Sequence, residues 1–378
     1  MEALRWETAG KLFSIYSTFC IQQQSLNPQK KTVKLRDLSK TFSKMPENLP
    51  NEILEMVTNR LNMFDKIRLR RVSKRLRSVV YLDKNSYCDV YISVADSEIC
   101  LKLRGRMGRL ELIYKKCKEG TSIQRTSLGG GDKLIRGTNF MDVAQADIKS
   151  LISLRTTIGR LEVHQTMSDS EKTAHFWQPL CNWNVPNLKI VANNGFQVHV
   201  VLKVVQPTVL TDMRLEFVRI GFSIHTNAFS ISQCVNSDQW KQLNMFKSRS
   251  LIRKSNLQHL SHLKQIDVIS EVECEDVVRF CLVLSNSNVL ESAVLRFTDR
   301  LPVPRLVAVF RKTNMHIAQP SWNNVLRIAM DEFSSTFVKL TERVAVVMRK
   351  LATDQDEEVI IEKIEKLTYE VTRYNTSI

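Results

Sequence analysis

The chain has 378 residues, of which 43% are hydrophobic and 25% are charged. This composition is ordinary for a folded protein of two or three domains, and it argues against disorder throughout. Only 11 glycines and 9 prolines are present, which argues against an all-β sandwich or barrel. The formal net charge of +16 fits a nucleic-acid partner, an anionic surface or simply a basic protein, and does not choose among them.

The first 82 residues divide into a basic leader and a small helical unit. Residues 1–45 form the leader, which carries six lysines and arginines against one acid between positions 28 and 44, and we expect it to be disordered. Within residues 46–82, Pro50 suits the first position of a helix. Apolar residues then recur at offsets of 0, 1, 4 and 8 from Ile53, which is the spacing of one helix face. A second apolar helix face follows. A unit this small needs a partner or a neighbouring domain to cover it.

Residues 83–138 are predicted to form a hairpin and a linker. Apolar and polar residues alternate over 87–104 on both sides of a turn at 95–98, as is typical of two antiparallel strands. Residues 118–138 contain five glycines, three of them consecutive, and we interpret them as a loop or flexible linker.

Short alternating segments recur between residues 139 and 345 at a period near 27 residues, with helix-like stretches such as 141–154 and 274–286 between them. The segments begin at Leu161, Leu188, Leu215, Ile266, Ala293 and Leu326. One strand and one helix per repeat predict a stack in which neighbouring units share a core. The gap from 217 to 266 is expected to hold an irregular unit around Trp240. Residues 346–378 are predicted to be an amphipathic helix with an acidic N-terminus.

The predicted fold class is therefore α/β (α+β), with a small helical unit followed by an irregular leucine-rich-repeat-like α/β solenoid. The eight cysteines stand singly, without a CxxC pair or a zinc-like Cys/His spacing, so we expect reduced core thiols and no metal or other cofactor. Neither a secretory signal nor an apolar run of membrane-spanning length is visible. We expect a cytoplasmic or nuclear protein without a membrane partner.

The sequence of residues 49–80, LPNEILEMVTNRLNMFDKIRLRRVSKRLRSVV, resembles an F-box. The positions that match are Leu49, Pro50, Glu52, Ile53, Val57, Leu61, Asp65, Arg71, Val72, Ser73, Leu76 and Arg77. Leu76 stands where many F-boxes carry tryptophan, and nematode F-box families usually have leucine there. Further along, residues 239–241, 259–287 and 304–310 are similar to the FTH domain that follows the F-box in one large nematode family.

This resemblance implies a non-catalytic adaptor. F-boxes bind a Skp-type adaptor, which links them to a cullin–RING ubiquitin ligase, so the chain would be a substrate-recognition subunit whose C-terminal domain holds a target protein. The residues implied to bind the Skp-type adaptor are Leu49, Pro50, Ile53, Leu54, Val57, Leu61, Val72 and Leu76. Their apolar stripe exceeds what so small a unit covers alone, as is typical of an interface. The alternative is internal packing against residues 87–117.

Two other functions remain open alternatives. The helix at 66–77 carries seven basic residues, which with the leader could form a nucleic-acid-binding module, although no aromatic residues interleave with the charges for base stacking. The chain could also be a scaffold that binds a protein without leading to its ubiquitination.

No motif points to catalysis, and we predict that the protein is not an enzyme. Residues 129–133 lack the spacing of a P-loop, and residues 105–108 lack the third glycine of a dinucleotide fingerprint. His259 and His262 could share a helix face, but no third metal ligand lies near them in the sequence. The carboxylates between Glu271 and Asp276 fit a loop and an acidic first helical turn better than a catalytic pair.

Overall fold

The computed structural model describes residues 50–52, 54, 86–105, 108–125, 130–152, 156–218, 231–313, 317–318, 325–329, 335–350 and 357–375. The basic leader and most of the helical unit expected at 46–82 lie outside these residues. Helices and strands both recur over the described part of 86–375, so the mixed α/β class expected from the sequence is confirmed.

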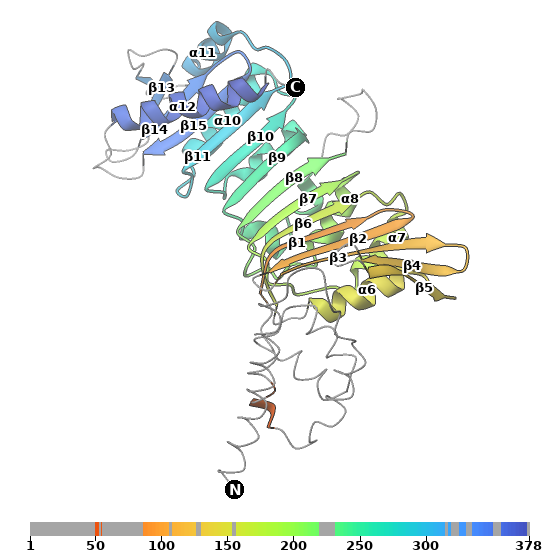
Figure 1. Cartoon of the computed structure of the whole chain (residues 1–378). Helices are drawn as coiled ribbons and strands as arrows, with labels where there is room; N and C mark the ends of the chain where they lie inside the picture. The colour runs from red at the N-terminus through yellow and green to blue at the C-terminus, as the bar shows by residue number, and fades with distance from the viewer. Residues whose placement is uncertain are drawn as a thin grey trace, which may run out of the picture.

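The described strands form one fifteen-stranded sheet (Figure 1). The parallel strands at its centre are, in spatial order, β1 (Ser86–Val94), β6 (Thr157–Gln165), β7 (Asn187–Ala192), β8 (Asp212–Phe217), β9 (Met245–Ile252), β10 (Gln265–Ser270) and β11 (Ser292–Phe297). The antiparallel strands beyond β1 are β2 (Glu98–Gly105), β3 (Gly108–Cys117), β4 (Gly120–Arg125) and β5 (Gly130–Arg136). Those beyond β11 are β15 (Val344–Lys350), β14 (Ser335–Leu340), β13 (Val325–Ala329) and β12 (Ile317–Ala318).

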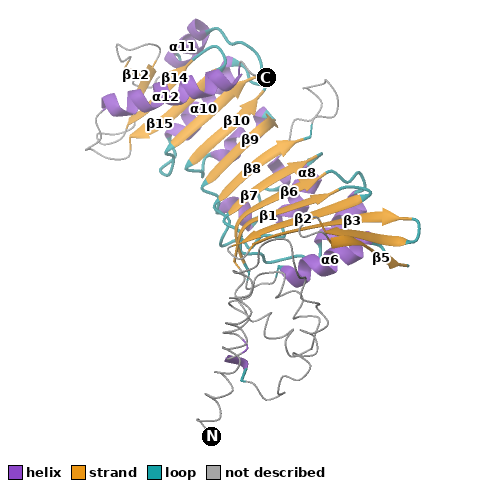
Figure 2. Cartoon of the chain, viewed as in Figure 1, coloured by secondary structure: helices purple, strands orange, loops and turns teal. Residues whose placement is uncertain are grey.

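Helices cover one face of this sheet, and one further helix lies on the other face (Figure 2). The first group is α6 (Phe140–Leu151), α7 (Ser170–Trp177), α8 (Gly195–Leu202), α9 (Asp238–Lys241), α10 (Cys274–Ser285) and α11 (Val303–Arg311), with 3-10 turns at Ile231–Gln233 and Lys254–Leu260. Leu295 of β11 belongs to the core of these helices, whereas its neighbour Val294 packs with Ile360 and Ile364 of α12 (Glu357–Asn375). Helix α12 therefore covers the opposite face, at the C-terminal end of the sheet.

The register of the parallel strands follows the expected 27-residue period only in part. Leu161 pairs with Leu188, and Ile266 pairs with Ala293, at that spacing. Leu188, however, pairs with Met213 and not with Leu215, because the connection into β8 is two residues shorter. Leu215 still lies on the same face, since side chains in a strand alternate with a period of two. The gap before residue 266 contains a strand of the same stack, β9, beside α9.

The segment at 118–138, expected to be a flexible linker, instead forms strands β4 and β5. One of its glycines permits the close approach of these strands. Gly120 has a φ of +143°, and a Cβ atom there would lie 2.2 Å from the carbonyl oxygen of Ile135. Only glycine tolerates both conditions. The hairpin expected at 87–104 is confirmed as β1 and β2, and β1 also pairs with β6, so the hairpin continues the main sheet.

The end of the chain differs from the expected pattern. Leu326 begins no further parallel repeat, because β13 pairs antiparallel with β14. Residues 344–350 form β15, and the C-terminal helix begins only at Glu357. Glu357 and Glu358 occupy its first turn, which agrees with the acidic N-terminus predicted from the sequence.

Strands β1 and β6 approach each other closely at Gly159, where a Cβ atom would lie 2.8 Å from the carbonyl oxygen of Cys88. We expect Gly159→Ala to lower the free energy of unfolding by about 1–3 kcal/mol, because the backbone must shift to admit the methyl group. Urea denaturation measures the loss. Thr157→Ala, exposed on the same strand, is the control and should change stability by about 0.5 kcal/mol or less. Equal effects of the two changes would contradict the close approach.

Candidate functional site

One face of the central sheet carries no helix over β1 to β10 within the described residues, and we term it the open face (Figure 2). Apolar side chains such as Leu161 and Val163 enter the helix-covered core, so the residue between them, Glu162, lies on the open face. One row of open-face residues runs in register across the strands from β2 to β10. It consists of Lys102, Tyr91, Glu162, Lys189, Arg214, Lys247 and Asp267.

The carboxylate of Glu162 is held by an ion pair with Lys189 and a hydrogen bond with His164. Its Oε1 atom lies 2.9 Å from Lys189 Nζ and 2.8 Å from His164 Nε2. Lys189 also approaches Glu216, at 3.9 Å. Burial alone would raise the pKa of Glu162, but the hydrogen bonds from Lys189 and His164 outweigh burial and lower the pKa. This carboxylate is therefore ionised and already neutralised by its neighbours.

Three cations on β8 and β9 lack such a partner. Arg214 and Arg249 are exposed and Lys247 is half-buried, and none of the three forms an ion pair with another described residue. We term Arg214, Lys247 and Arg249 the basic cluster. Lys189, Arg214 and Lys247 lie directly opposite one another on neighbouring strands. Like charges in such positions destabilise a sheet, so this arrangement has a cost to the fold.

A bulge in β9 positions Arg249. Beyond the Lys247–Asp267 pair, three residues of β9 lie opposite a single residue of β10. The hydroxyl of Ser250 accepts a hydrogen bond from the Phe217 backbone N–H at 2.5 Å, in place of a regular ladder bond. Bulges of this kind redirect side chains, and here the bulge places Arg249 beside the rest of the basic cluster.

Asp267 lies next to the basic cluster but is bound to a different cation. Arg296 Nη2 donates a hydrogen bond to it at 2.8 Å. Burial raises the pKa of Asp267, against the effect of Arg296, Lys247 and Arg249. Two further carboxylates, Asp212 and Glu216, lie on the same face of β8, and each contacts a group outside the basic cluster: Asp212 accepts from the Thr211 hydroxyl at 3.0 Å, and Glu216 lies 3.9 Å from Lys189. The acids near the basic cluster are therefore held by other groups.

An aromatic side chain marks the other part of the row. The ring of Tyr91 lies 4.9 Å from that of His164, centroid to centroid, and Lys102 Nζ lies 5.4 Å from the Tyr91 ring. A hydrogen bond with Glu111 raises the pKa of Lys102 and fixes its ammonium group. Tyr91 is half-buried, and an amphipathic ring of this type is a common anchor in protein interfaces.

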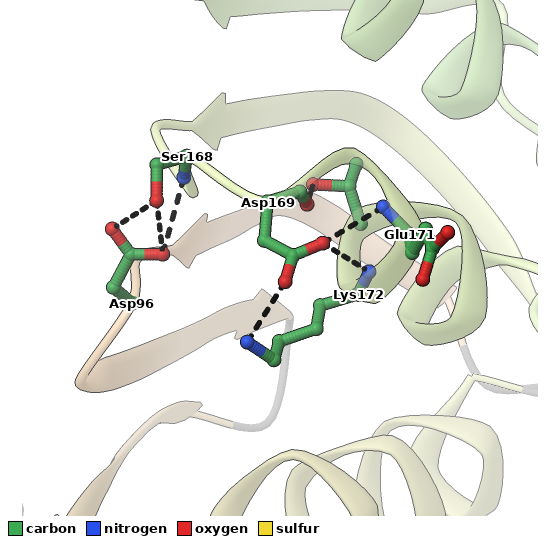
Figure 3. A network of polar contacts seen from close by, with 6 residues as sticks. Asp96, Ser168, Asp169, Glu171 and Lys172 are labelled. Atoms are coloured by element: carbon green, nitrogen blue, oxygen red, sulfur yellow. Dashed lines mark hydrogen bonds and ion pairs between the residues drawn. The ribbon is translucent and has the colours of Figure 1, made fainter.

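The loop after β6 is fixed to the turn between β1 and β2 (Figure 3). Ser168 donates hydrogen bonds to Asp96 from its backbone N–H at 3.1 Å and from its hydroxyl at 3.0 Å. Asp169 caps α7 by accepting from the N–H groups of Glu171 and Lys172. The Lys172 ammonium, 2.8 Å away, lowers the pKa of Asp169. These contacts cap the start of α7 and hold the loop before it against the β1–β2 turn.

Two of the residues predicted to bind a Skp-type adaptor are described. The backbone N–H of Leu54 donates to the Pro50 carbonyl oxygen at 3.2 Å, in agreement with a helix that starts at Pro50. Leu54 is 6% exposed and is therefore covered within the chain, whereas Pro50 is half-buried. The residues that lie outside the described part are Leu49, Ile53, Val57, Leu61, Val72 and Leu76, and their role stays a prediction.

The weaker candidates from the sequence have structural roles. His262 Nε2 donates to the Trp240 carbonyl oxygen at 2.9 Å. The carboxylates at the start of α10 cap that helix, since the Glu273 N–H donates to Asp276 Oδ2 at 3.1 Å. Gly105 ends β2 and Gly108 begins β3, so these residues belong to a hairpin and not to a dinucleotide-binding turn.

The cysteines were expected in the core, and this is wrong for three of those described. Cys88, Cys117 and Cys181 are exposed, because they lie at strand positions or loops that face away from the core. Burial raises the pKa of Cys234 and of Cys281 to about 12. Within the described residues all cysteines are free and no group of side chains could hold a metal ion. The described helices include none that is long and apolar enough to cross a membrane.

The basic cluster was missed in the sequence, although it left a signal there. Arg214 stands between Met213 and Leu215, and both neighbours are buried. A lone cation between two buried strand residues must lie on the uncovered face of a sheet. Arg214 can be recognised as part of a cluster only when the strand order is known, because that order places β8 beside β9.

Comparison with known proteins finds two domain matches in this chain. Residues 46–85 match the F-box domain and residues 171–312 match the FTH domain. The chain thus carries an F-box followed by an FTH domain, as the resemblance in its sequence indicated. It is also similar to F-box A protein 224 of Caenorhabditis elegans, with 21% identity over 271 residues, or 68% of each chain. The FTH match extends from α7 to just past α11 and includes the basic cluster.

Proposed function

We propose that this protein is a non-catalytic, substrate-recognition adaptor of a cullin–RING ubiquitin ligase. Residues 46–82 dock on a Skp-type adaptor, and the α/β sheet holds a target protein. The adaptor then raises the effective concentration of the target near the ubiquitin-conjugating enzyme. The observation that carries this proposal is the F-box match ahead of the FTH match in one chain.

The architecture supports a binding role for the second domain. We propose that its parallel strands form an irregular leucine-rich-repeat-like solenoid, in which each unit adds one strand to a continuous surface. The open face offers charged and aromatic side chains from several successive strands, and the described residues place no helix over them between β1 and β10. A surface of this kind suits recognition of a protein.

Docking through the F-box is tested by capture of the full chain on an immobilised Skp-type adaptor. Ile53→Asp should reduce capture by at least about tenfold, because an aspartate on the apolar stripe opposes burial at an interface. Asn51→Asp is the matched control, since Asn51 is exposed and the new carboxylate lies in a first helical turn, where the helix dipole favours it. Equal capture of wild type and Ile53→Asp would contradict the assignment.

A further inference from the structure

We propose that the basic cluster of Arg214, Lys247 and Arg249 binds an acidic segment of the target protein, through ion pairs with its aspartate and glutamate side chains. This inference rests on the proposed function, because it names the chemistry of the target that the sheet holds. It assigns the contact to the part of the open face formed by β8 and β9.

The first support is that the fold, as far as it is described, leaves these three cations without an ion pair. Glu162 is neutralised by Lys189 and His164, and Asp267 is paired with Arg296. Within the described residues no carboxylate forms an ion pair with the basic cluster, because the nearby Asp212, Glu216 and Asp267 are each held by another group. The segment 219–230, which follows β8, contains no aspartate or glutamate in its sequence. The three cations are therefore available to pair with an external carboxylate.

The second support is the geometry of the cluster. Arg214 and Lys247 are in register on adjacent strands, which places their backbones roughly 4.8 Å apart. Carboxylates one turn apart on a helix, or on neighbouring residues of an extended segment, can meet cations at such a separation. The bulge in β9 adds Arg249 to the same region. The cluster can thus bind two or three carboxylates of one continuous segment.

The third support is that the sheet retains like charges side by side. Arg214 and Lys247 lie opposite each other on β8 and β9, so their like charges repel. A partner that supplies negative charge removes this repulsion on binding. The repulsion then destabilises only the free protein, so its relief makes binding of the partner more favourable.

The pattern of charge favours a protein over a nucleic acid. Phosphates repeat along a nucleic-acid backbone and need a continuous basic track. The open face instead places Glu162 and Asp267 on either side of the cluster and Glu216 beside Arg214 on β8, and the cluster contains no aromatic ring for base stacking. A segment with a few carboxylates fits a cluster two strands wide, whereas a longer polyanion would meet these acids.

The test measures binding of a short fluorescein-labelled oligoglutamate peptide to the full chain by fluorescence anisotropy. The triple variant Arg214→Glu, Lys247→Glu, Arg249→Glu should bind at least about tenfold more weakly, equal to about 1.4 kcal/mol. The matched control is Lys149→Glu, Lys203→Glu, Arg279→Glu, which has the same net charge but changes exposed residues on the helix-covered side. It should bind the peptide within about twofold of wild type, and all variants should keep the same melting temperature within a few degrees.

Three results would overturn the proposal. The first is equal weakening by the cluster and control variants, which would show attraction by net charge alone. The second is the absence of peptide binding by wild type at low salt. The third is tighter, cluster-dependent binding of an oligothymidylate of equal charge, which would make the cluster a nucleic-acid site. Capture by the Skp-type adaptor reports separately on the proposed function, because the cluster variant should retain it while Ile53→Asp should lose it and still bind the peptide.

Discussion

Replacing Trp177 with alanine is expected to lower the free energy of unfolding by about 3–5 kcal/mol. Trp177 is 1% exposed at the end of α7, and its ring meets that of Phe176 edge to face, with centroids 5.1 Å apart. Its indole N–H donates to Gln165 Oε1 at 2.8 Å, at the end of β6. The alanine variant leaves a cavity and also removes the donor of this buried hydrogen bond.

A second variant separates these two effects. Gln165→Leu keeps most of the volume, leaves the Trp177 N–H without its acceptor and removes the hydrogen bond from Gln165 Nε2 to the Thr173 hydroxyl, which together should cost about 1–3 kcal/mol. Denaturation of both variants by urea gives the two losses. Gln178→Ala, a change at the C-cap of α7, is the control and should have the smaller effect. A loss below about 1 kcal/mol for Trp177→Ala would contradict the close packing of α7 on β6.

Ile364→Asp is expected to release α12 from the sheet. Ile364 is fully buried and belongs to a small cluster with Phe337, Val346 and Val294. An unpaired carboxylate in this cluster should cost about 3–5 kcal/mol, enough to detach one amphipathic helix. Limited proteolysis should then cleave the chain within 357–375, a segment that we expect to be protected in the wild type.

The control for this change is Lys363→Asp, one residue earlier on the exposed side of the same helix. It introduces the same carboxylate without burying it, so cleavage should stay as slow as in the wild type. Equal protection of Ile364→Asp would show that α12 does not depend on the apolar contact. The strands under α12 carry apolar side chains on this face, and release of α12 would expose them.

The sequence predicted the helix and strand types well where a clear periodicity was present. The strands that begin near Leu161 and Leu188 and the helix at 274–285 follow directly from their apolar spacing. Glycine misled the reading of 118–138, because a glycine that permits two backbones to approach looks in the sequence like one in a flexible linker. Local pattern does not distinguish the two.

Strand pairing was the part that local pattern could not supply. The segment at Leu326 alternates like the repeats, yet it pairs antiparallel, because the choice of neighbour depends on residues far along the chain. The basic cluster has the same origin, since Arg214 and Lys247 are 33 residues apart and meet only through the β8–β9 pairing. The F-box match came instead from a continuous motif, which a sequence reveals without any knowledge of packing.

The central claim is that one chain uses two independent surfaces, one for the Skp-type adaptor and one for the target. Surface plasmon resonance of the full chain on an immobilised Skp-type adaptor tests it most directly, with wild type, Ile53→Asp and the basic-cluster variant compared side by side. The account predicts equal affinity for wild type and the cluster variant, and a loss of at least about tenfold for Ile53→Asp. Binding that is absent in wild type, unaffected by Ile53→Asp or abolished by the cluster variant would contradict it.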